Sequence, residues 1–246
     1  MQISGGTMIS VPLLFSICFS AICTVSLFLG IYTFYTDPMA KTNRLFFSLT
    51  ISLAIWSFGF AMAISAPDIS TCLLWRRFAA IGWGVFFTLL LRFLISLCGF
   101  TSMLNRWWKY VLLYLPAAVC ILVFTYFPWF NPEQYKLVHT PMGWVNVSIK
   151  NFWDWFFILY YVTYTIVGIY LIWRWGKNES SKNIKKQSDI IMRAFIVTLI
   201  LGVFSESIVN NVFSIRIPQI APIIMLIPVA AVSYAMQKYG FLYIRR

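Results

Sequence analysis

The sequence predicts an all-α integral membrane protein, a seven-transmembrane helix bundle that forms a single domain over residues 1–246. Three observations support this fold class. The chain is 61% hydrophobic and only 11% charged, whereas about a quarter of the residues of a soluble domain are charged. Its mean hydropathy is +0.80. Seven apolar runs each approach or exceed the roughly 20 helical residues needed to cross a bilayer.

The seven runs define the helices that we expect, in order along the chain. Their residue ranges are 10–34, 45–65, 73–98, 110–127, 152–175, 190–213 and 218–237. No basic residue precedes the first run, which is too long for the core of a signal peptide, so we expect this helix to be retained. The longest loop, 128–151, is too short for a soluble domain. Pro222 and Pro228 in the last helix each remove a backbone bond and predict hinges there.

The distribution of basic residues predicts the orientation in the membrane. One set of loops, together with the end of the last helix, holds 13 of the 19 basic residues, and the other side holds five. The thirteen are Lys41, Arg44, Arg106, Lys109, Arg174, Lys177, Lys182, Lys185, Lys186, Arg193, Lys238, Arg245 and Arg246. The positive-inside rule then places the N-terminus outside and the C-terminus in the cytoplasm. The net charge of +12 thus sets topology and attracts anionic lipid, and we expect no nucleic-acid partner.

The sequence contains no recognisable catalytic or cofactor motif. No P-loop, dinucleotide fingerprint, HExxH or GxSxG pattern occurs. The single histidine, His139, does not make a metal site, and the five cysteines fit no metal-binding spacing. We therefore expect no enzyme activity, no metal and no cofactor in this chain.

A few polar residues inside the apolar runs are the candidate functional residues. Glu206 and Asn210 are four positions apart, so they share a helix face. Arg76 and Arg77 open the third helix, and Arg92 lies further along it. By helical rise, a contact between Glu206 and Arg77 or Arg76 is feasible in the outer half of the bundle. We expect these residues to bind a ligand or couple a signal. Trp75 would form one wall of the binding site.

A purely structural reading of the same residues stays open. Arginines near a helix end can extend to the lipid headgroups, which would account for Arg76, Arg77 and Arg92. A protonated Glu206 would hold helices together through hydrogen bonds worth about 0.6 to 2 kcal/mol.

Several segments resemble the seven-helix sensor region found at the N-terminus of bacterial histidine kinases. They are Thr-Asp-Pro at 36–38, Asn-Arg-Leu-Phe-Phe at 43–47, Ala-Ile-Trp-Ser-Phe-Gly-Phe-Ala at 54–61, Leu-Trp-Arg-Arg at 74–77, Pro-Met-Gly-Trp at 141–144, Ile-Pro at 217–218 and the run 233–242. The resemblance implies a multi-pass protein of the bacterial inner membrane. It also implies a cytoplasmic signalling output, a kinase or diguanylate cyclase, in a separate chain or in a segment beyond Arg246.

The sequence and the resemblance together favour a sensor of two-component signal transduction. We expect an unidentified small ligand, contact with the lipid bilayer, a cytoplasmic signalling partner and a homodimer. The alternative is a small transporter or channel subunit, because intramembrane charge is also typical of transport pathways. The sequence has no internal repeat to favour that alternative.

Overall fold

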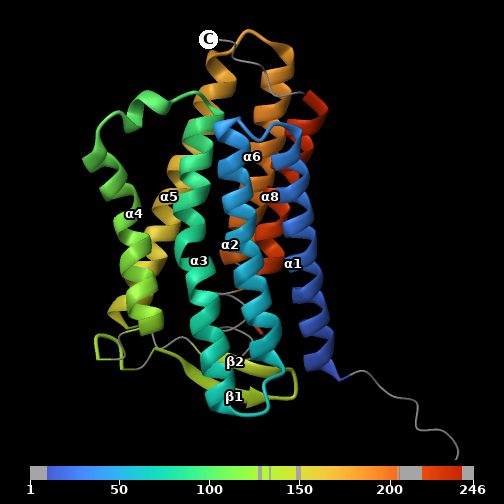
Figure 1. Cartoon of the computed structure of the whole chain (residues 1–246), viewed down its shortest axis with the longest axis vertical. Coiled ribbons are helices and arrows are strands. Elements are labelled where there is room, and N and C mark those ends of the chain that lie inside the picture. Colours follow the sequence, from blue (N-terminus) through green and yellow to red (C-terminus); the bar gives the residue numbers. More distant parts are fainter. Residues whose placement is uncertain are drawn as a thin grey trace, which may run out of the picture.

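The computed structural model describes residues 10–126, 129–132, 134–147, 151–203, 205 and 218–239. Within these residues the chain forms seven α-helices, a short 3-10 helix, a π-helical segment and one β-hairpin. The helices run side by side, and the hairpin lies across one end of the bundle (Figure 1). This confirms the predicted helical membrane fold.

The first three helices form an up-down-up unit that holds most of the core. Their bounds are Val11–Thr36 for α1, Lys41–Ile64 for α2 and Ile69–Leu97 for α3. Short links join them, so each pair is antiparallel and packs along its length. Most of the apolar window of α2 and of α3 is buried, whereas α1 lies at the edge of the bundle with its apolar face largely exposed. Exposed apolar side chains on a membrane helix contact lipid acyl chains.

The next helices form the other side of the bundle (Figure 1). The 3-10 helix η1 is Thr101–Leu104, α4 is Trp107–Ile121, its π-helical continuation η2 is Leu122–Tyr126, and α5 is Phe152–Asn178. Pro116 lies inside α4 and interrupts its ladder of backbone hydrogen bonds. The nearby Leu113 carbonyl accepts hydrogen bonds from the hydroxyls of Thr88 on α3 (3.1 Å) and Tyr164 on α5 (2.9 Å). These two hydrogen bonds tie α4 to α3 and α5 one turn before the proline.

The last two described helices pack against each other. They are Lys182–Val203 for α6 and Ala221–Tyr239 for α8. The helix predicted from residue 190 therefore begins at Lys182, because its first two turns are basic and amphipathic and lie outside the apolar run. The rest of that predicted helix, 204 and 206–213, lies outside the described residues. Six helices among the described residues are long and apolar enough to cross a membrane, namely α1, α2, α3, α4 with η2, α5 and α8.

The hairpin consists of β1 (Lys136–Thr140) and β2 (Gly143–Val147), which pair antiparallel. The sequence predicted only a loop here. Gly143 has a positive φ of 99°, and a Cβ at this position would lie 2.5 Å from the carbonyl oxygen of Ile64. Glycine therefore permits both the turn and the close approach of the hairpin to the end of α2. The Trp144 indole N–H donates to the Ala66 carbonyl (2.8 Å), which fastens the hairpin to the link between α2 and α3.

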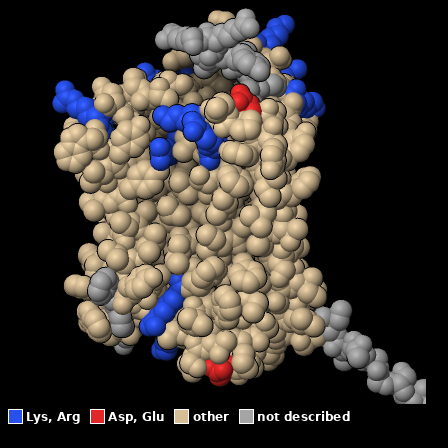
Figure 2. Space-filling view, viewed as in Figure 1, with Lys and Arg blue, Asp and Glu red and all other residues tan. Residues whose placement is uncertain are grey.

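Basic side chains gather at the end of the bundle opposite the hairpin. Figure 2 shows several groups of them at that end, including one at the left over the beginning of α4, and a smaller group toward the hairpin end of this face. The loops rich in basic residues and the loops poor in them thus lie at opposite ends of the bundle. The orientation prediction rests on this difference.

Candidate functional site

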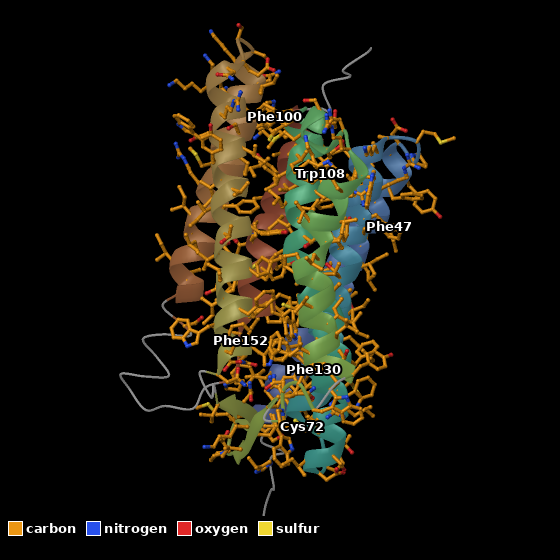
Figure 3. The ribbon with its side chains drawn as sticks, turned by 90° about the vertical axis from the view of Figure 1, so that its left-hand side faces the viewer. Phe47, Cys72, Phe100, Trp108, Phe130 and Phe152 are labelled. Carbon is orange, nitrogen blue, oxygen red and sulfur yellow. The ribbon has the colours of Figure 1, made fainter. Side chains whose placement is uncertain are left out.

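The candidate site lies inside the bundle near the hairpin, about two turns into α3. Figure 3 labels Cys72, one turn before Arg76, at this end, with Phe130 and Phe152 at the same end of the molecule. The α3 helix begins after Asp68, which caps it by accepting from the Thr71 backbone N–H at 2.8 Å. The phase of α3 turns Arg76 toward the interior, where the residue is only 3% exposed.

Arg76 joins four separate segments of the chain. Its Nη1 donates to Gln219 Oε1 (2.5 Å), in the segment that leads into α8. Its Nη2 donates to the backbone carbonyl of Trp144 in β2 (3.1 Å). The guanidinium also lies 4.6 Å from the centre of the Phe60 ring on α2, in cation–π geometry. A buried charge is costly unless other groups solvate it, and these contacts do so here.

Arg77 faces a different direction and holds a different segment. Its Nε donates to Gln134 Oε1 (3.1 Å), and Gln134 Nε2 in turn donates to the carbonyl of Val123 in η2 (2.7 Å). This chain of hydrogen bonds ties α3 to the end of η2 through the loop before the hairpin. Arg77 therefore connects α3 to the loop before the hairpin, whereas Arg76 connects it to the segment before α8.

A cavity of about 100 Å³ adjoins Arg76. Aromatic side chains form much of its wall, and polar groups come from five segments: α3, the loop before the hairpin, β2, α5 and the segment before α8. The lining residues are Trp56, Phe60, Arg76, Trp83, Phe124, Tyr135, Asn146, Asp154, Phe157, Gln219 and Ala221.

The aromatic wall is held by edge-to-face contacts between rings. Trp83 packs against Phe124 with ring centres 5.0 Å apart and against Phe157 at 4.6 Å. Trp56 packs in the same way on Phe60, at 6.2 Å. Such pairs stabilise by about 0.5–1.5 kcal/mol each beyond their buried area, so they fix the shape of the cavity.

Three lining residues carry a buried polar atom that has no hydrogen-bond partner among the described residues. These atoms are the donors Trp56 Nε1 and Arg76 Nε and the acceptor Asn146 Oδ1. Buried polar groups in native proteins are nearly always paired. Three unpaired atoms around one cavity therefore mark a place where the described residues do not complete the hydrogen bonding.

Tyr135 contributes a neutral donor to the same wall. Its hydroxyl donates to the carbonyl of Phe124 (3.2 Å) and lies 3.5 Å from the carbonyl of Arg76. Burial raises the pKa of Tyr135 above its usual range, although the charge of Arg76 acts in the opposite direction. The hydroxyl thus stays protonated near neutral pH.

Two other residues predicted for the site, Trp75 and Arg92, lie away from the cavity. Trp75 packs against Phe58 and Phe78, with ring centres 5.6 and 5.7 Å away, and Trp56 and Trp83 line the cavity in its place. Arg92 lies toward the other end of α3, where Nη1 donates to the Tyr114 hydroxyl (2.5 Å). Of the predicted site residues that the structure describes, Arg76 alone lines the cavity, and Arg77 follows it on α3.

Glu206 and Asn210 lie outside the described residues, so their contact with Arg76 or Arg77 stays a prediction. The two prolines of α8 differ in position. Pro222 is the second residue of the helix, where a missing N–H breaks no helical bond, whereas Pro228 lies in the helix interior. Because the helix begins at Ala221 and not at residue 218, only Pro228 interrupts it.

Sequence reasoning missed Gln219, Asn146 and Tyr135. Each lies in a loop, in the hairpin or beside a helix end, where polar residues are common and carry no signal of their own. Trp56 gave a weak signal, because an indole deep within an apolar run lies away from the membrane interface that tryptophan prefers. Within the described segments, no group of three or more His, Cys, Asp or Glu side chains could hold a metal ion.

The fold and the site define a membrane protein of several spans with a partly polar cavity near one end of its helix bundle. The chain belongs to the family described as the N-terminal seven-transmembrane region of histidine kinase, whose model matches residues 18–245. A comparison with curated proteins gives no match. The chain is therefore a membrane sensor region of the bacterial inner membrane, and its spanning helices contact the lipid bilayer.

Proposed function

We propose that this chain is an input module that converts a stimulus at its outer cavity into a change in the position of α8, and so in the activity of a cytoplasmic kinase or cyclase. The family supports the sensor class. The predicted orientation places the hairpin end outside and the end of α8 at Tyr239 on the cytoplasmic side.

The hydrogen bond between Arg76 and Gln219 is the observation that carries this proposal. Arg76 lies on the wall of the cavity, and Gln219 stands two residues before α8. A stimulus that changes the bonding of Arg76 would release or tighten this connection. Hydrogen bonds to a charged group contribute about 1.5–3 kcal/mol, enough to shift a two-state equilibrium roughly ten- to a hundredfold.

Replacement of Gln219 by leucine tests the proposal, because leucine keeps the approximate size of the side chain and removes its acceptor. In cells that express the full chain at normal levels, we expect Gln219→Leu to lock the output in one state. The readouts are the phosphorylated fraction of the cell's response regulators and the level of cyclic diguanylate. Deletion of the chain provides the reference for lost input.

Gln134→Leu is the matched control. Gln134 also accepts from an arginine of α3, but its partner is Arg77, and among the described residues its bonds reach α3 and η2 and not the segment before α8. The Gln134→Leu variant should therefore give a signalling response close to that of the wild type. Equal responses for wild type and Gln219→Leu would contradict the proposal, and so would solute flux through vesicles reconstituted with the chain alone.

A further inference from the structure

We infer that the cavity beside Arg76 binds a small carboxylic acid that carries a hydroxyl or amino group next to its carboxylate. This inference rests on the proposed function, because it names the stimulus that the input module would receive. It draws on the unpaired polar atoms around the cavity, the size of the cavity and the character of its walls.

The two unpaired donors call for an anionic group. The terminal nitrogens of Arg76 donate to Gln219 and to the Trp144 carbonyl, so Nε is the guanidinium nitrogen that has no partner among the described residues. Trp56 Nε1 adds a second donor, and Trp56 is only 4% exposed. A carboxylate is an acceptor with two oxygens, and it forms strong, short bonds with arginine.

The unpaired acceptor calls for a donor on the same molecule. Asn146 Oδ1 has no partner among the described residues. The carboxyl group of Asp154, which makes contacts of its own, belongs to the same wall. A hydroxyl or ammonium group near the carboxylate would match these oxygens, whereas a simple fatty acid would leave the Asn146 oxygen unpaired.

The size of the cavity limits the ligand to a few atoms. An apolar cavity of about 150 Å³ accommodates benzene, and this cavity has about 100 Å³. A ligand of at most about six non-hydrogen atoms is therefore the largest that fits. The rings of Trp83, Phe124 and Phe157 leave room for a short apolar substituent and are poor partners for water.

Binding is measured with the full chain in lipid nanodiscs, through its thermal melting and its tryptophan fluorescence. The probes are L-lactate, L-alanine, propionate and propane-1,2-diol. We expect saturable binding of lactate or alanine. Propionate lacks the donor and should bind about two- to tenfold more weakly, as expected for one lost neutral hydrogen bond. Propane-1,2-diol lacks the carboxylate and should not bind.

Three variants assign binding to this cavity. Trp56→Phe removes the indole N–H and keeps an aromatic ring. Arg76→Lys removes Nε and keeps the positive charge. Each variant should weaken binding at least about tenfold. Ala221→Met fills the cavity without removing a polar group and should abolish binding. Trp173→Phe, on α5 outside the cavity-lining set, is the control and should bind as the wild type does.

Two results would overturn the inference. One is the absence of saturable binding for all four probes to a wild-type chain that melts cooperatively, which would mean that the cavity holds water only. The other is binding that both Trp56→Phe and Ala221→Met leave unchanged, because the ligand would then lie elsewhere. Neither result alters the expected signalling defect of Gln219→Leu, so failure of the ligand inference is distinguishable from failure of the proposed function.

Discussion

Two adjacent arginines have different roles because successive side chains on a helix point about 100° apart. Arg76 points into the bundle and bonds to Gln219 and Trp144, whereas Arg77 points toward the loop before the hairpin and bonds to Gln134. The direction of each arginine thus follows from the rotational setting of α3, which is fixed by the side chains that it buries along its length.

Asp68 fixes the start of α3, and its charge can be tested by pH. Hydrogen bonds from the side chain of Ser70 and from the backbone and side chain of Thr71 lower the pKa of Asp68 from 3.8 to about 2. A carboxylate with a lowered folded-state pKa stabilises the folded chain above its unfolded pKa. That stabilisation is lost as the pH falls through the folded value.

We therefore expect Asp68→Ala to lower the melting temperature at pH 7, because the first turn of α3 loses its cap. The difference from the wild type should shrink as the pH falls from about 4 to about 2. The measurement is thermal melting in detergent micelles across this range. Asp189→Ala is the control, because it removes a solvent-exposed ion pair with Arg193, a class of contact that adds little stability. A difference that does not vary with pH would show that the charge of Asp68 has no part in capping.

At the scale of elements, glycine sets the distance between α2 and α3. A Cβ on Gly82 would lie 2.5 Å from the Ser52 carbonyl oxygen and from the Trp56 backbone nitrogen on α2. A Cβ on Gly59 would lie 2.7 Å from the Cβ of Ala79 on α3. Small residues at such crossings let two membrane helices approach closely and gain van der Waals contact.

Gly82→Ala should separate α2 from α3, because backbone atoms cannot move aside as a flexible side chain can. Overpacking of this kind costs about 1–3 kcal/mol, and it would also displace Trp56 at the cavity wall. We expect a lower melting temperature in micelles and weaker lactate binding. Gly202→Ala on α6 is the matched control, since a Cβ there meets no described atom within 4 Å. Equal melting of the two variants would refute the close-packing argument.

The sequence predicted elements well where the bilayer dictates them and poorly elsewhere. Apolar runs revealed the spanning helices because a lipid-exposed segment must be apolar and must satisfy its own backbone. The first turns of α6, with Lys182 and Lys185, obey no such constraint, so hydropathy placed that helix start too late. The hairpin escaped prediction for the same reason, since short strands outside the membrane show no long pattern.

At the scale of the whole molecule, the site could be predicted only in part. Arg76 was recognisable because charge inside a membrane segment is rare. Its partners were not, because Trp144 lies 68 and Gln219 lies 143 positions away in sequence. Only the tertiary arrangement brings α2, α3, the hairpin and the start of α8 to one cavity.

The orientation of the whole molecule decides whether that cavity faces the outside. The hairpin and the amino-terminal turns of α6 lie at opposite ends of the bundle (Figure 1). Lys136 in β1 and Lys185 in α6 are both exposed, so they offer matched labelling sites. Of the five cysteines, Cys18 and Cys23 are the two that are not buried. Replacement of Cys18 and Cys23 by alanine gives a background variant whose remaining, buried thiols react little with maleimide.

In this background we expect a membrane-impermeant maleimide to label Lys136→Cys in intact spheroplasts. Lys185→Cys should react only after the membrane has been opened. The α5–α6 link and the other loops at that end of the bundle carry an excess of basic residues. Basic loops are retained in the cytoplasm, so we expect this end to lie there. Labelling in the opposite order would reverse the topology. The cavity would then open toward the cytoplasm, where it could report an internal metabolite but not an external one.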